Sequence, residues 1–83
     1  MKQYLRKYEL AARLDVNRHT LGNWISDFRE FIPIHIQGDV ECFDLEAIAV
    51  LMRIKTLRKE LYSKRSIRGI LANEGYPIQT NNR

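Results

Sequence analysis

The segment from Arg18 to Phe28 carries polar side chains that can contact the edges of nucleic-acid bases. Its apolar residues recur at the spacing of an amphipathic helix, at Leu21, Trp24, Ile25 and Phe28. At about 100° per residue, the opposite side of this helix carries His19, Gly22, Asn23 and Ser26. In a DNA major groove, Asn pairs bidentately with adenine, and basic or hydroxyl side chains reach base edges and phosphates. The residues that we predict to read bases are Arg18, His19, Thr20 and Asn23.

A second expected helix and a tight turn come directly before this segment. Leu10, Ala11 and Leu14 share one face of a helix over residues 7–14. Asp15 is one of the few residue types that tolerate a left-handed backbone, and Asn17 is a good N-cap for the next helix. Two helices joined in this way are the plan of a DNA-binding helix-turn-helix, whose second helix lies in the major groove.

Gly22 is unusual inside an expected helix, where glycine costs up to about 1 kcal/mol relative to alanine. The functional interpretation is that Gly22 lets the helix backbone approach the floor of the groove closely. The alternative is that Gly22 packs against another element or is simply tolerated. We favour the first, because Gly22 is predicted to face away from Trp24.

The residues from Pro33 to Phe43 read as a β-hairpin with its turn at Gly38 and Asp39. A hairpin that follows a helix-turn-helix is a wing. The groups that this wing could offer to DNA belong to His35, Gln37 and Gly38. Because Asp39 and Glu41 repel phosphate, we predict reduced DNA contact, with contact to a partner subunit as the alternative.

Two further helices follow the hairpin, over residues 45–60 and 64–74. Asp44 is expected to cap the first of these helices. Apolar residues occupy nearly all faces of that helix, so we expect it to form the centre of the core. Gly75 and Pro77 end the second. Tyr4 and Leu5 form either a short strand or a lead-in. One domain is expected over residues 1–76, with 77–83 as a flexible tail or the start of a linker.

The start of the last helix breaks a local rule. Lys64 and Arg65 lie in its first turn, where the positive end of the helix dipole disfavours cations. The free N–H groups of this helix end and the Ser63 hydroxyl could bind a DNA phosphate together with the two cations. The alternative is that these residues form only a solvated basic surface. The residues that we predict to bind phosphates are Lys7, Arg13, Ser63, Lys64, Arg65 and Arg68.

Composition favours a polyanionic partner over catalysis. The 83 residues carry a net charge of +4, and five acids with no Lys or Arg in residues 30–52 separate two basic flanks. A solvated charged surface explains the same pattern. No catalytic motif, cofactor motif, metal-ligand spacing or small-molecule site stands out, so we expect neither an enzyme nor a cofactor. A single cysteine, Cys42, and the lack of a long apolar run fit a reducing cytoplasm with no membrane segment.

Together these motifs resemble the DNA-binding domain of the MerR superfamily from about Tyr4 to Ala72. The matching residues are Glu9-Leu10-Ala11, Leu14-Asp15-Val16-Asn17, Thr20-Leu21, Trp24, Phe43, and Tyr62-Ser63 with Ile67. The resemblance implies a mainly α winged helix-turn-helix with four helices plus the wing. It also implies binding of double-stranded DNA as a homodimer on pseudo-palindromic sites. The chain departs from the family pattern at Asp15 (usually Gly), His19 and Gly22 (often Arg), and Glu41 (often basic).

The chain is also similar to RacA-like chromosome-anchoring members and to excisionase-like modules, which use the same fold without sensing a small molecule. We therefore predict sequence-specific DNA binding, as a transcription regulator or as a DNA-segregation factor on repeated, centromere-like sites of the nucleoid or a plasmid. The alternative is a protein–protein interaction module on the same fold, which would use the acidic middle segment to dock a basic partner.

Overall fold

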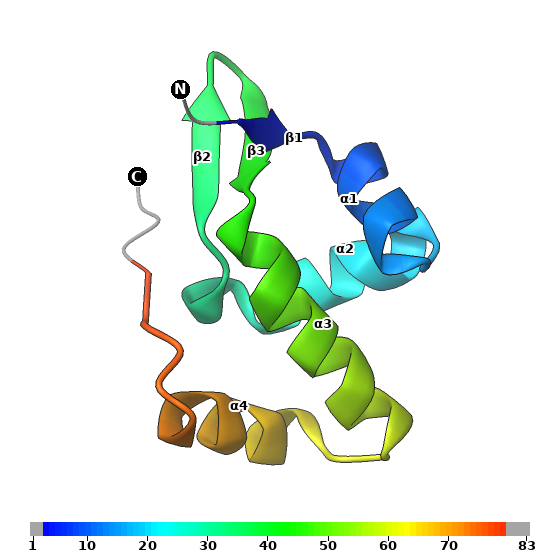
Figure 1. Ribbon diagram of the computed structural model, residues 1–83, viewed down its shortest axis with the longest axis vertical. Coiled ribbons are helices and arrows are strands. Elements are labelled where there is room, and N and C mark those ends of the chain that lie inside the picture. The colour runs from blue at the N-terminus through cyan, green and yellow to red at the C-terminus, as the bar shows by residue number, and fades with distance from the viewer. Residues whose placement is uncertain (1–2, 80–83) are drawn as a thin grey trace.

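The computed structural model describes residues 3–79, which form four α-helices, one 3-10 turn and a three-stranded antiparallel sheet. In chain order the elements are β1 (Tyr4–Leu5), α1 (Lys7–Leu14), α2 (Arg18–Asp27), η1 (Arg29–Phe31), β2 (Ile34–Gln37), β3 (Val40–Asp44), α3 (Glu46–Lys59) and α4 (Lys64–Asn73). Figure 1 shows the hairpin at one end of the molecule, α4 at the other end, and α3 running between them beside α1 and α2. The predicted winged helix-turn-helix is confirmed.

The helix-turn-helix forms through the local signals that the sequence carries. Asp15 adopts a left-handed backbone with φ of 57°, and its N–H donates to the carbonyls of Ala11 and Ala12. The Asn17 carboxamide oxygen accepts a hydrogen bond from the Thr20 N–H at 2.8 Å, which satisfies an otherwise unpaired donor in the first turn of α2. These two residues fix the turn between α1 and α2.

The sheet has the order β1-β3-β2, so Tyr4 and Leu5 form a strand rather than a lead-in. β1 pairs with the carboxyl end of β3, where Leu5 lies opposite Phe43. β2 pairs along β3, with Ile34 also opposite Phe43. Gly38 turns the hairpin with φ of 62°, a conformation open to glycine at little cost. The wing is therefore anchored at its base by three core side chains and extends into solvent at its tip.

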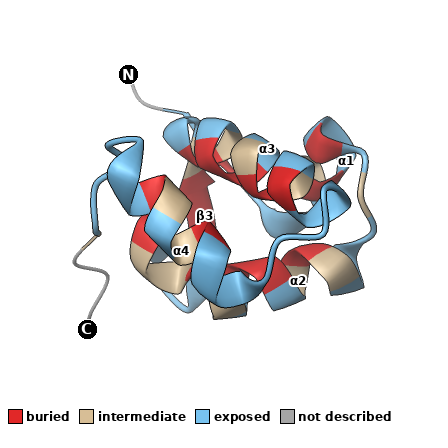
Figure 2. Ribbon diagram, turned by 90° about the horizontal axis from the view of Figure 1, so that it is seen from below, coloured by how far each residue is buried: buried red, intermediate tan, exposed pale blue. Residues whose placement is uncertain are grey.

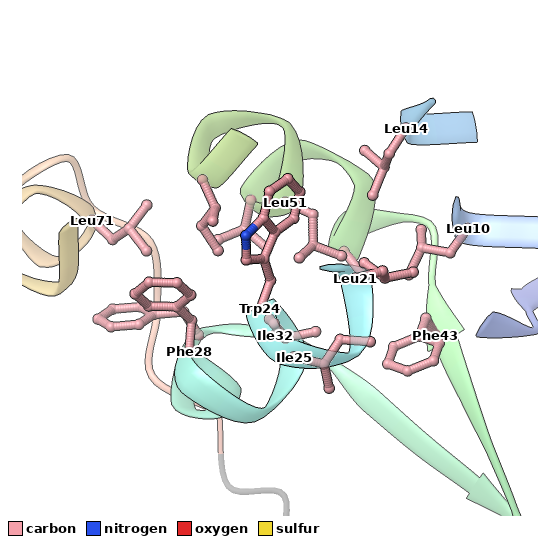
Figure 3. Packing of buried hydrophobic residues seen from close by; sticks show 14 of the residues in the cluster. Leu10, Leu14, Leu21, Trp24, Ile25, Phe28, Ile32, Phe43, Leu51 and Leu71 are labelled. Carbon is pink, nitrogen blue, oxygen red and sulfur yellow. The ribbon is translucent and has the colours of Figure 1, made fainter. Parts of the chain in front are cut away.

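The core draws residues from every helix and from β1, η1 and β3. Figure 3 shows Leu10 and Leu14 of α1 beside Leu21 of α2, and Trp24 directed toward α3. Figure 2 shows the buried faces of α2 and α3 turned toward each other. The apolar stripe of α2 is thus covered completely, which leaves only its polar side for a ligand.

α3 begins one residue later than predicted, at Glu46, and its N-cap position is Leu45. The Asp44 carboxylate still satisfies the helix end, because its Oδ1 accepts from the Glu46 N–H at 3.1 Å. α3 packs against α1, β3 and α4, as expected for the spine of the core. Its apolar surface is not fully covered, however, since Leu45 is 41% exposed and Met52 is 48% exposed.

The joint between α3 and α4 contains a strained leucine. Leu61 has φ of 69° and its side chain is 90% exposed, so no packing accounts for a bulky residue in this conformation. Its N–H donates to the Arg58 carbonyl at 2.9 Å, and the Tyr62 N–H donates to the Leu57 carbonyl at 3.1 Å. These two hydrogen bonds end α3 in a pattern that usually has glycine at the left-handed position, which Leu61 occupies here.

Leu61→Gly should therefore raise the free energy of unfolding by about 0.5–1 kcal/mol, because relief of the left-handed strain exceeds the added entropy of the unfolded chain. The matched control is Glu60→Gly, since Glu60 has φ of −85° and gains nothing from glycine. Chemical denaturation followed by circular dichroism measures both. An equal loss of stability in the two variants would show that Leu61 is not strained.

The chain after α4 returns along η1. Gly75 adopts φ of 92° and ends α4, and the Gln79 N–H donates to the Glu30 carbonyl at 2.6 Å. The Arg53 guanidinium of α3 donates three hydrogen bonds to the Glu74 carboxylate at the end of α4, and these bonds lower the pKa of that carboxyl. The part of the expected tail from Pro77 to Gln79 thus lies against the domain, and residues 80–83 lie outside the described residues.

Candidate nucleic-acid interface

The polar side of α2 carries the exposed side chains of this helix. Arg18, His19 and Asn23 are exposed, and Thr20 is half-buried. Ser26 continues the exposed side one turn beyond Asn23. Opposite them, the apolar stripe is at most 9% exposed. The four residues predicted to read bases therefore lie on a short helix whose other side is fixed to the core (Figure 2).

Gly22 lies in the middle of α2 against a side chain of α1. A Cβ atom built at Gly22 would come within 2.9 Å of the Lys7 Nζ and 3.4 Å of the Lys7 Cε. This contact was not predictable from the sequence, and it places the Lys7 ammonium group beside α2. Gly22 does contact another element, but only through the flexible end of a lysine that can move aside.

Gly22→Ala separates the two interpretations of this glycine. We expect the substitution to raise the free energy of unfolding by up to about 1 kcal/mol, because alanine is the better helix former and Lys7 can shift at little cost. We also expect weaker DNA binding, because the added methyl group stands where the backbone would approach the groove. Denaturation and a DNA titration measure the two effects. Unchanged DNA affinity in a stabilised variant would leave Gly22 with no role in binding.

The amino end of α4 lies against the carboxyl end of α2, so the predicted phosphate-binding residues adjoin the predicted base-reading helix. The Lys64 Nζ lies 3.2 Å from the Asp27 Oδ2. Ser63 is the N-cap of α4, and its hydroxyl oxygen accepts from the Ser66 N–H at 3.1 Å. Arg65 is exposed and makes no ion pair within residues 3–79. This end of α4 thus presents one free cation and one paired cation.

Arg68, which we predicted to bind phosphate, makes three contacts inside the domain. Its Nη2 donates to the Asp27 carbonyl at 2.9 Å, and its Nε lies 3.3 Å from the Glu30 carboxylate. Its guanidinium also lies over the Phe28 ring, 5.7 Å from the centroid. These contacts join α4 to the end of α2 and to η1, which gives Arg68 a positioning role that the sequence did not reveal.

The wing is tied to the domain by polar contacts of its own. The His35 ring stacks on Tyr4 of β1, with centroids 4.4 Å apart. The Gln37 side-chain oxygen accepts a weak hydrogen bond from the Cys42 thiol at 3.7 Å, and Gly38 is exposed at the tip. The Glu41 carboxylate accepts from the Arg29 guanidinium at 2.7 Å, so part of the acidic charge is balanced locally. Lys7 and Arg13, two of the residues predicted to bind phosphates, are exposed on α1 and do not belong to the wing.

Other kinds of site find no support in the described part of the chain. Within residues 3–79, no three metal-ligating side chains come together. None of the helices there has both the length and the apolar composition that a membrane crossing requires.

Comparison with known proteins gives one result. The model of the MerR HTH family of regulatory proteins matches residues 6–74, which includes all four helices and the wing. No curated protein and no solved structure matches the chain. The match extends over most of the chain, and the family binds double-stranded DNA. The chain therefore belongs to the MerR HTH family of regulatory proteins.

Proposed function

We propose that this protein binds double-stranded DNA sequence-specifically, with α2 in the major groove. The observation that carries the proposal is the exposed polar side of α2 opposite a fully buried apolar stripe, next to the basic end of α4. Asn23 is the reader of adenine, since its carboxamide offers a donor and an acceptor side by side. Arg18, His19 and Thr20 lie in the first turn, where recognition helices contact base edges.

Phosphate contacts fix the position of the helix in the groove. Lys7 lies beside α2, and Lys64 and Arg65 extend the basic surface past the carboxyl end of α2. Arg13 in the last turn of α1 supplies a further exposed cation, and Ser63 orders the N–H groups of α4. Such contacts provide affinity without sequence information, whereas α2 provides the sequence preference.

The proposal includes a homodimer that acts in the cytoplasm. It binds pseudo-palindromic or repeated sites of nucleoid or plasmid DNA. Two copies of α2 related by a two-fold axis would read half-sites about one helical turn apart. Transcription control and DNA segregation are two uses of the same groove-reading surface.

The test is to incubate the protein with sheared genomic and plasmid DNA at physiological salt and to sequence the retained fragments. Single enriched sites at promoters would support a regulator, and their half-site spacing would give the dimer geometry. Clustered repeats at one locus would support a segregation role. No enrichment over the input would refute sequence-specific binding.

A protein-interaction module is the second candidate, because residues 30–52 hold five acids and no Lys or Arg. This candidate draws less support from the described contacts. Glu30 is paired with Arg68 and Glu41 with Arg29, so these carboxylates are partly neutralised within the domain.

A further inference from the structure

The carboxyl end of α2 places an acid beside Lys64, one of the cations that we propose to bind phosphates. Asp27 is the last residue of α2, and its carboxylate oxygen lies 3.2 Å from the Lys64 Nζ. The Lys64 side chain is 53% exposed, whereas that of Asp27 is 26% exposed. The ammonium group can therefore reach solvent while the carboxylate stays against the domain.

Asp27 occupies an electrostatically poor position within its own helix. The carboxyl end of a helix carries partial negative charge and disfavours an acidic side chain. A carboxylate and a phosphate both offer anionic oxygens to an ammonium group at the same distance. Lys64 thus holds, in the free protein, a partner of the same chemistry as the DNA backbone.

We propose that Asp27 competes with DNA phosphate for Lys64, so that binding exchanges the carboxylate for a phosphate oxygen. This inference rests on the proposed DNA binding. Because the exchange gives up an ion pair and leaves a carboxylate close to the DNA backbone, Asp27 lowers affinity for every duplex. Duplexes that also satisfy the base-reading side chains of α2 overcome that penalty, so Asp27 suppresses non-specific binding.

The exchange does not require α4 to move, because separate contacts hold the helix. Arg68 binds the Asp27 carbonyl and the Glu30 carboxylate, and neither bond uses the Asp27 side chain. Ile67 and Leu71 of α4 are 0% exposed in the core. Lys64 can thus leave Asp27 while the backbone of α4 stays in place.

Asp27→Asn is the test, with binding to a fluorescein-labelled duplex of random sequence measured by anisotropy across a range of salt concentrations. We expect about two- to five-fold tighter binding at low salt, the fold-change that corresponds to the loss of one surface ion pair. The slope of log K against log salt should steepen by up to about one. Asp27→Ser should give the same gain, which separates the loss of charge from an effect of side-chain shape. Circular dichroism checks that both variants fold.

The control is Asp39→Asn, which makes the same change in net charge at the exposed tip of the wing, far from α4 in Figure 1. We expect a smaller gain from it, and no gain from Asp27→Asn beyond this control in a Lys64→Ala background. If Asp27→Asn binds no tighter than Asp39→Asn, or gains equally without Lys64, Asp27 does not compete for Lys64. If the unmodified protein shows no salt-dependent binding at all, the proposed function itself fails.

Discussion

Phe28→Ala should lower the free energy of unfolding by about 3–5 kcal/mol, the largest stability loss that we expect from a single substitution here. The Phe28 side chain is 0% exposed, and Figure 3 shows it between the end of α2 and Leu71 of α4. Its removal leaves a cavity near the contacts that join α2, η1 and α4. Small domains are stable by only about 5–15 kcal/mol, so this variant should keep little of its stability.

Chemical denaturation monitored by circular dichroism measures the loss. Met52→Ala is a suitable control, because Met52 is 48% exposed on α3 and its truncation opens no cavity. We expect that control to change stability by less than about 1 kcal/mol. Equal denaturation midpoints for the two variants would mean that Phe28 does not join the helices as described. DNA binding by Phe28→Ala should weaken as the folded fraction falls, since the fully buried Phe28 side chain that packs at the end of α2 is removed.

Asn23→Ala should weaken binding to the preferred duplex by about 1–3 kcal/mol, the second large effect. Asn23 is exposed in the middle of α2, and alanine is a better helix former, so stability should not fall. The loss should be concentrated at one base pair of the site, where the variant discriminates less. This pattern separates base reading from a general loss of affinity.

Titrations of the variant against the site and against its single-base-pair substitutions measure this effect. Ser26→Ala provides the control, since Ser26 is also exposed on α2, one turn nearer its carboxyl end. We expect a smaller loss from it. A uniform loss on all sequences with Asn23→Ala would assign Asn23 to the DNA backbone instead of a base.

The fold was predictable because short-range signals agree with one another along the chain. The bounds of α1 follow from its apolar spacing, and the caps at Asn17 and Ser63 mark where α2 and α4 begin. The wing is predicted by the alternation of apolar and polar residues on the two sides of the Gly38 turn. Each signal lies within a few residues of the element that it specifies, so no knowledge of tertiary contacts is needed.

The site was predictable only in part, because its charges are paired across distant segments. The bonds of Lys64 to Asp27 and of Arg68 to Glu30 join parts of the chain far apart in sequence. No periodicity reports them, so the sequence predicts a phosphate-binding role for Arg68 without revealing its contacts to Asp27 and Glu30. The contact of Lys7 with Gly22 is hidden for the same reason.

The buried thiol in the wing makes slow opening of the sheet measurable. Cys42 is the single cysteine of the chain and is 2% exposed on β3, the strand that pairs with both others. A thiol reagent can react only when β3 is transiently uncovered, so the rate of labelling reports how often this happens. When the free energy of opening obtained from the labelling rate equals the free energy of global unfolding, the wing opens only with the whole domain. When the free energy of opening is the smaller of the two, the wing opens independently of the rest of the domain. Bound DNA that restrains the wing would then slow the labelling reaction.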